Sequence, residues 1–318
     1  MRVLFAGTPD VAVTALDALA DSGHEVAAVL TQPPARRGRS RTLQPSPVAA
    51  WAAQRSVPIL DPVRVRSDEA KAQIAALDVQ AAPVVAYGQL LDRAVLDLVP
   101  GGWFNLHFSL LPAFRGAAPV QRAIEAGVTA SGVSVFRLDE GMDTGPLAQV
   151  APYTFGATET AGEALAGMAQ LGAGVLVEVL DALEAGRLTL TEQSTEGVSY
   201  ATKINARDLP VDPARPAVAV RAHIAAHAPS PGAFVEIGGV RVRLTGVGLE
   251  AAPDNMRLAP GELGVTKKYL FLGTATTPLE ITRVVPAGKK EMAAADFARG
   301  ARLSTGDRID SAAAKENA

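Results

Sequence analysis

The first thirty residues contain a strand, a helix and a second strand, and this pattern restricts the fold more than any other feature of the chain. Residues 2–6 form a short apolar run, Asp10 can cap a following helix, and residues 24–30 form a second apolar run. Two strands joined through a helix pair in parallel, with the helix covering one face of the sheet. The pattern therefore predicts an α/β domain with a mostly parallel sheet.

The turn after the first strand, residues 7–10, holds a single glycine. Dinucleotide-binding turns carry Gly-x-Gly-x-x-Gly, because the backbone must approach the pyrophosphate closely. An NAD-dependent oxidoreductase is therefore not favoured.

The pattern of helices and strands is interrupted near residues 205–216, where three prolines are typical of a linker. A length of 318 residues suits two domains, and 48% apolar residues supply a core for each. Beyond the prolines, short strands alternate with glycine-containing turns, which favours a small β-barrel. We expect one domain over residues 1–205 and a second over residues 206–318.

Residue usage narrows the possible chemistry. The chain has no cysteine, which excludes disulfides, thiolate metal sites and cysteine nucleophiles. The four histidines are dispersed, and His223 and His227, at i, i+4 spacing, lack a metalloprotease signature. We expect that pair to lie on a solvated helix face and the protein to bind no metal.

No apolar run approaches the ~18 residues of a membrane span, and the chain begins directly with strand residues, which leaves no room for a signal peptide. We expect a cytoplasmic protein. Because no heptad seam or long apolar helix face is evident, we expect a monomer.

An amide and an imidazole, Asn105 and His107, lie two residues apart at the end of a predicted strand, so their side chains point to the same side. Asp143, in an acidic turn after another predicted strand, can meet His107 across adjacent strand ends. The amide N–H and a protonated imidazole can stabilise an oxyanion, while the carboxylate orients the imidazole and favours its charged form. The three side chains predict acyl transfer to an amine.

Two alternatives accompany this hypothesis. A pair such as Asn105 and His107 can simply form hydrogen bonds in a turn. Ser109 also follows closely, but it lacks the Gly-x-Ser-x-Gly context of a nucleophile, so covalent catalysis is the weaker interpretation.

The ordered series of residues 105–112, then 115–119, then 143–145, closely resembles the folate-dependent formyltransferases. The resemblance implies that Asn105, His107 and Asp143 are catalytic and that the formyl donor is N10-formyltetrahydrofolate. It further implies that folate is bound by Tyr87, Gly88, Gln89, Leu90, Ser109, Leu110, Leu111, Pro112 and Asp139. Residues 87–91 have an alternative interpretation as an ordinary βα turn.

Residues 5–10 and 286–292 are similar to the opening and the tail signature of the methionyl-tRNA formyltransferase branch of that family. This resemblance implies a Rossmann-like formyltransferase domain, a C-terminal OB-like barrel that binds tRNA, and methionyl initiator tRNA as the acceptor.

Basic residues gather in two places. Residues 1–205 carry 15 Lys and Arg against 21 Asp and Glu, whereas residues 206–318 carry 15 against 12. An arginine-rich loop follows the second strand, and arginine suits phosphate contacts. We expect tRNA contacts from Arg36, Arg37, Arg39, Arg41, Lys267, Lys268, Lys289 and Lys290. A solvated loop and the polar face of an ordinary sheet are the alternatives.

The closest rival function is folate-dependent formylation of an amino sugar nucleotide or of glycinamide ribonucleotide, and the arginine loop and the tail signature count against it. An RNA-binding module on an inactive scaffold is a rival from another class. The intact Asn105, His107 and Asp143 count against that one.

Overall fold

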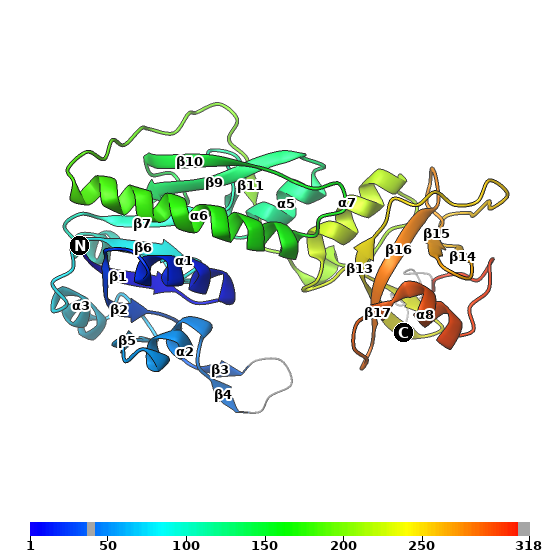
Figure 1. The fold of residues 1–318 in the computed structure, drawn as a ribbon, viewed down its shortest axis with the longest axis horizontal. Helices are drawn as coiled ribbons and strands as arrows, with labels where there is room; N and C mark the ends of the chain where they lie inside the picture. Colours follow the sequence, from blue (N-terminus) through cyan, green and yellow to red (C-terminus); the bar gives the residue numbers. More distant parts are fainter. Residues whose placement is uncertain (37–41, 311–318) are drawn as a thin grey trace. The chain divides into compact units, whose positions relative to one another are not determined.

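The computed structural model describes residues 1–36 and 42–310 (Figure 1). The chain forms two compact units. The first contains Met1–Pro119, Ala130–Tyr153 and Leu165–Ala201, and the second contains Val120–Thr129, Thr154–Ala164 and the described residues from Thr202 onward. The domain boundary after residue 205 stays a prediction.

A seven-stranded sheet forms the centre of the first unit, in the order β10-β9-β7-β6-β1-β2-β5. Neighbouring strands from β5 to β7 pair in parallel, and β9 is antiparallel to β7. The Rossmann-like fold class is confirmed. The strands are β1 (Arg2–Gly7), β2 (Glu25–Leu30), β5 (Ile59–Leu60), β6 (Ala82–Val85), β7 (Trp103–His107), β9 (Ala130–Arg137) and β10 (Leu147–Thr154).

Helices and two short ribbons accompany this sheet. The helices are α1 (Asp10–Ala20), α2 (Pro47–Gln54), α3 (Asp68–Ala75), α4 (Arg93–Leu96) and most of α6 (Ala161–Glu184), whereas α5 (Pro119–Glu125) belongs to the second unit from Val120 onward. The ribbons pair β3 (Ala35–Arg36) with β4 (Leu43–Gln44) and β8 (Arg115–Gly116) with β11 (Tyr200–Ala201). Pro9, not Asp10, is the N-cap of α1, and Asp10 lies in the first turn, where a carboxylate suits the helix dipole.

Helix α6 is the one helix in the described part of the chain that is long and apolar enough to cross a membrane, so the expectation that no such run exists is wrong. Its Met168, Leu176 and Leu180 are fully buried, as in the core helix of a globular domain. A Cβ on Gly172 would lie 2.6 Å from the Leu106 side chain, so glycine lets α6 approach β7 closely.

Pro83 lies inside β6, although proline favours a strand that starts after it. The pairing of β6 with β1 is Ala6 with Val84 and Gly7 with Val85, and Pro83 itself pairs with Phe104 of β7. The strand therefore tolerates a residue without an N–H, because the regular pairing with β1 begins beyond it.

The second unit is built on an antiparallel sheet in the order β12-β13-β16-β15-β14, with β17 paired to β16. Its curled, half-barrel form agrees with the barrel-like domain predicted from sequence. Fully or nearly fully buried Val242, Leu244 and Val284 contribute to its core. The elements are η1 (Ala206–Asp208), α7 (Ala217–His227), β12 (Phe234–Ile237), β13 (Val240–Val247), β14 (Leu263–Val265), β15 (Leu270–Leu272), β16 (Leu279–Pro286), β17 (Met292–Ala293) and α8 (Ala294–Gly300).

Candidate active site

Strand β7 carries the first two residues of the candidate site at its carboxyl end. Asn105 pairs with Val84 of β6 and Phe136 of β9, so it lies in the interior of the sheet. Leu106, on the opposite face of β7, is buried beneath α6. The alternation of the strand therefore turns Asn105 and His107 away from α6, to one side of the sheet.

Asp143 lies next to His107 in the structure. Its Oδ2 is 3.8 Å from His107 Nδ1, a separation that leaves no direct hydrogen bond between them. The same oxygen accepts a 2.8 Å hydrogen bond from the Gly116 N–H. Asp143 has a φ of 54°, and such strained backbone in non-glycine residues gathers at functional sites.

The other imidazole nitrogen is committed to the backbone. His107 Nε2 lies 3.0 Å from the Phe114 carbonyl, which can only accept, so Nε2 carries a proton. Burial lowers the pKa of His107, and this effect outweighs the opposing influences of Asp143 and the Phe114 carbonyl. At neutral pH the ring is therefore neutral with a lone pair on Nδ1, contrary to the expectation of a protonated imidazole.

The Asn105 side chain is partly exposed and makes no hydrogen bond to any residue that the structure describes. An amide held in a sheet without an internal partner is free to donate to a bound molecule. The site thus combines a free N–H donor with a neutral base and a nearby carboxylate.

Gln193 holds the loop that carries Asp143, a role that the sequence did not reveal. Its Nε2 donates to the carbonyls of Asp143 and Gly145, each at 2.8 Å. Its Oε1 accepts from Arg115 at 2.7 and 3.2 Å. Arg115, which donates these two hydrogen bonds, is 9% exposed.

Ser199 supports the other side of the site, because its Oγ accepts a 2.9 Å hydrogen bond from the Phe114 N–H. The Phe114 carbonyl in turn holds His107. Gln193 and Ser199 lie in a segment of irregular structure with no periodic signal, and only their spatial contacts identify them.

We expect Gln193→Ala to lower kcat by roughly 10- to 100-fold with little change in KM, because a displaced Asp143 no longer faces His107 correctly. Steady-state kinetics with saturating substrates measure this. Gln149→Ala, which removes an exposed hydrogen bond to Glu178, is the matched control and should leave kcat unchanged. Unchanged kinetics in Gln193→Ala would show that the Asp143 loop needs no such support.

The predicted folate residues of the segment after β6 have unequal exposure. Tyr87 is buried, which raises its pKa, and its carbonyl accepts from Thr8 Oγ1 at 2.7 Å. The Gln89 amide is bound to the backbone of Val65 and Pro62, so it shapes the loop. Gly88, with a φ of 93°, forms the turn between these two anchored residues, and the Leu90 side chain that follows them is 82% exposed.

The predicted folate residues after β7 form a compact turn. Ser109 is fully buried and donates to the Ala113 carbonyl at 2.6 Å, which occupies its hydroxyl and further disfavours a serine nucleophile. Leu110 is half-buried, Leu111 is buried, and the Leu111–Pro112 bond is cis. Asp139 caps its own turn by accepting from the Gly141 N–H and the Thr144 hydroxyl.

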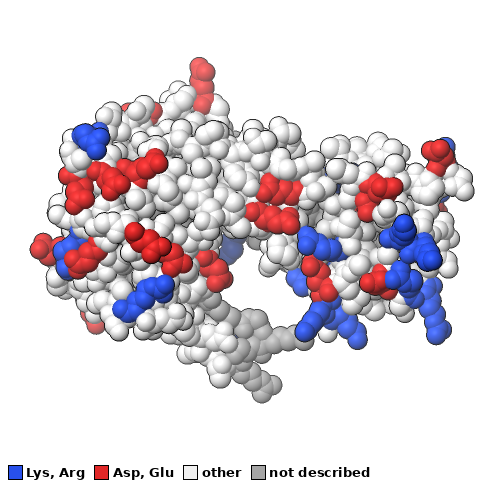
Figure 2. Space-filling model, in the orientation of Figure 1, with Lys and Arg blue, Asp and Glu red and all other residues white. Residues whose placement is uncertain are grey.

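The residues predicted to contact tRNA are exposed wherever the structure describes them. Arg36 ends β3, while Arg37, Arg39 and Arg41 lie outside the described residues. Lys267 and Lys268 lie in the turn before β15, and Lys289 and Lys290 in the turn before β17. Figure 2 shows basic side chains gathered on the visible face of the second unit.

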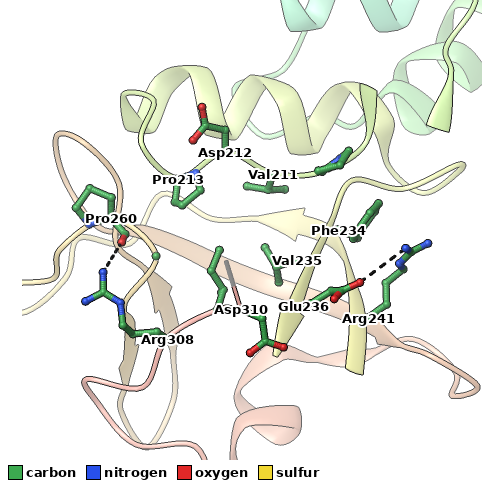
Figure 3. Close-up of a pocket in the computed structure, with 13 residues that line it drawn as sticks. Val211, Asp212, Pro213, Phe234, Val235, Glu236, Arg241, Pro260, Arg308 and Asp310 are labelled. Carbon is green, nitrogen blue, oxygen red and sulfur yellow. Dashed lines mark hydrogen bonds and ion pairs between the residues drawn. The ribbon is translucent and has the colours of Figure 1, made fainter. Parts of the chain in front are cut away.

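A cavity of about 580 Å³ opens within the second unit and is lined by Phe234, Glu236, Arg241 and Arg308, among others (Figure 3). Arg241 stacks 4.0 Å from the Phe234 ring centre and lies 3.8 Å from Glu236. None of the candidate catalytic side chains borders this cavity.

Comparison with known proteins shows the family to which the chain belongs. Residues 1–180 match the family model described as formyl transferase, and residues 203–302 match the model described as formyl transferase, C-terminal domain. The methionyl-tRNA formyltransferase of Nocardioides sp. is 48% identical over 309 residues, which cover 97% of this chain and 98% of that protein.

Two solved structures share the fold. One is WlaRD, a sugar 3N-formyl transferase in the presence of dTDP and 5-N-formyl-THF, with a TM-score of 0.66, 15% identity, and coverage of 91% of this chain and 99% of that chain. The other is methionyl-tRNA formyltransferase from Clostridium thermocellum, with a TM-score of 0.55, 14% identity, and coverage of 79% and 94%.

Proposed function

Because the chain belongs to the methionyl-tRNA formyltransferase family, we infer that it transfers a formyl group from N10-formyltetrahydrofolate to the α-amino group of methionyl initiator tRNA. The similarity over nearly the full length of both chains carries this conclusion. The reaction supplies formylated methionine for translation initiation.

The chemistry begins with attack of the neutral amine on the formyl carbon. A bond forms between the amine nitrogen and this carbon, and the carbonyl electrons move onto oxygen. Asn105 is well placed to donate to that oxyanion, because its amide has no other partner among the described residues. A hydrogen-bond donor at this position lowers the barrier by stabilising the negative charge that develops on the oxygen.

The attacking amine becomes positively charged and must lose a proton. His107 accepts it at Nδ1, since Nε2 is already protonated and bound to Phe114. Asp143, 3.8 Å away, stabilises the imidazolium that results. The proton then passes to N10 of the folate as the carbon–N10 bond breaks, so the imidazole returns to its neutral form.

In this mechanism the charge on Asp143 affects how kcat depends on pH. The reacting form of His107 is neutral, so activity falls as the pH drops below its pKa. Asp143 raises that pKa, so Asp143→Asn should lower it and move the acidic limb of kcat to lower pH, with a reduced plateau. Kinetics of both proteins across the pH range measure the shift, and Asp68→Asn, which removes an exposed ion pair with Lys71, is the matched control. A limb that moves to higher pH would contradict the assignment of His107 as the base.

For the acceptor stem of tRNA we propose contacts from Arg36, Arg37, Arg39, Arg41, Lys267, Lys268, Lys289 and Lys290. The charge of these side chains supports the proposal, because arginine and lysine neutralise phosphates. The basic residues that the structure describes are all exposed. For folate we propose the turn segments 87–90 and 109–112 together with Asp139. We further propose that the protein acts as a monomer in the cytoplasm, where charged tRNA and reduced folate occur.

An acceptor panel tests the substrate assignment. Purified protein and N10-formyltetrahydrofolate are incubated with methionyl initiator tRNA, an amino sugar nucleotide or glycinamide ribonucleotide. We expect formylation of the aminoacyl-tRNA alone. Formylation of a sugar amine in place of the tRNA would keep the fold and the chemistry but overturn the acceptor.

A further inference from the structure

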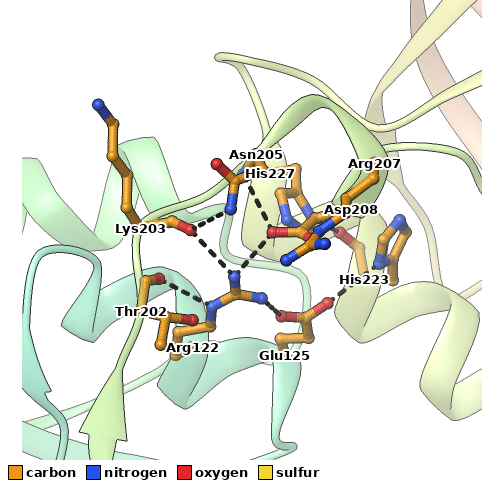
Figure 4. Close-up of polar contacts among 9 residues, drawn as sticks. All are labelled: Arg122, Glu125, Thr202, Lys203, Asn205, Arg207, Asp208, His223 and His227. Atoms are coloured by element: carbon orange, nitrogen blue, oxygen red, sulfur yellow. Dashed lines mark hydrogen bonds and ion pairs between the residues drawn. The ribbon is translucent and has the colours of Figure 1, made fainter.

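Three potential metal ligands meet in the second unit, at a place that formyl transfer does not use. Glu125 comes from the end of α5, and His223 and His227 come from α7 (Figure 4). One ligand atom from each of the three side chains lies within 4.8 Å of the other two. This grouping is not evident in the sequence, since Glu125 lies almost a hundred residues before His223.

The two histidines are buried, so the expectation of a solvated helix face is wrong. His223 is 6% exposed and His227 is fully buried, with ring centres 4.6 Å apart. Their i, i+4 spacing brings both rings to one face of α7. That face packs into the protein. The expectation that the chain binds no metal assumed that both histidines are solvated, so it loses its basis.

The hydrogen bonds of His227 leave a lone pair free for a ligand. Its Nδ1 lies 2.8 Å from the His223 carbonyl, which can only accept, so the proton is on Nδ1 and the lone pair is on Nε2. Nε2 of His227 and Nε2 of His223 are buried, and neither has a hydrogen-bond partner within residues 1–36 and 42–310. Metal-binding histidines commonly donate their second nitrogen to a backbone carbonyl in this way.

The Glu125 carboxylate lies between His223 and Arg122. Its Oε1 lies 3.2 Å from His223 Nδ1, and its Oε2 accepts from Arg122 at 2.7 Å. Arg122 also donates to Asp208 at 2.8 Å. Arg207 lies 4.0 Å from the same Asp208 carboxyl group, so two guanidinium groups balance the two carboxylates beside the rings.

We propose that Glu125, His223 and His227 form a binding site for a divalent first-row transition metal ion, with zinc as the best fit. Two imidazoles and one carboxylate are a ligand set that zinc accepts, with water as the fourth ligand. Ligand atoms around a tetrahedral zinc lie roughly 3.4 Å apart, so small rotations of the side chains close the site. The ion would tie the end of α5 to α7.

Zinc titration of the EDTA-treated full-length protein, in competition with a chromogenic chelator, tests the proposal. We expect one equivalent of zinc to bind to the wild type. His227→Gln and Glu125→Gln should each weaken binding by at least about 100-fold, since loss even of an outer partner costs 10- to 100-fold. His24→Gln is the control, because His24 with Asp181 and Glu184 forms the other such cluster, which the amino group of Met1 already contacts.

Absence of zinc binding to the wild type would overturn the proposal, as would equal binding by the wild type and both variants, or loss of binding in His24→Gln. If the variants unfold, the wild type loaded with Co²⁺ decides the question. Its visible spectrum should be that of a four-coordinate ion with nitrogen ligands, and a spectrum of free aqueous Co²⁺ would contradict the site.

Discussion

His107→Ala is expected to reduce kcat for formyl transfer by about 10²- to 10⁴-fold, the usual effect of removing a general base. The imidazole is held by the Phe114 carbonyl and lies 3.8 Å from Asp143, which leaves its Nδ1 to take the amine proton. Other residues bind folate and tRNA, so KM should change little. Single-turnover kinetics with saturating substrates separate the chemical step from binding.

Added imidazole provides the control for this variant. It should restore part of the activity of His107→Ala, because the base is replaced while the fold is unchanged, and it should not stimulate the wild type. A variant that keeps more than a tenth of the wild-type kcat would show that His107 is not the base.

Asn105→Ala is expected to lower kcat by about 10²- to 10³-fold, as the loss of one oxyanion donor does in other acyl-transfer enzymes. The amide donates only when negative charge develops on the formyl oxygen, so the loss falls on kcat and not on KM. Asn105→Asp keeps the size of the side chain but places a carboxylate beside the oxyanion, and its kcat should be at least as low.

The pairing of Asn105 with His107 makes a double variant informative. Residues that act in one transition state give less than additive losses, so the double alanine variant should be only slightly slower than His107→Ala. A loss equal to the product of the two single effects would indicate that the residues act in separate steps. An effect of Asn105→Ala confined to KM would assign it to substrate binding.

The sequence predicted the architecture well, because hydrophobic patterns are local. The strand–helix–strand pattern of the first thirty residues determines a parallel sheet, and short strands after the prolines determine an antiparallel one. The pattern also placed Asn105 and His107 on one side of β7, since two residues on a strand always share a face.

The sequence could not predict contacts that depend on tertiary structure. Gln193 lies fifty residues from Asp143, in a segment without periodicity, and nothing local marks it as the support of that loop. The protonation of His107 was predicted wrongly. The sequence suggests the nearby charge of Asp143 but not the burial of the imidazole, and burial has the larger effect on the pKa of His107. Burial also explains the error about His223 and His227, whose helix face packs inward.

The most direct test of the central claim is transfer of a radiolabelled formyl group from N10-formyltetrahydrofolate, with and without methionyl initiator tRNA. The mechanism predicts that the label appears on the α-amino nitrogen of methionine when the tRNA is present, and that the protein stays unlabelled when it is absent. Label that becomes covalently bound to the protein without an acceptor, or an aminoacyl-tRNA that remains unlabelled, would contradict direct attack by the amine at this site.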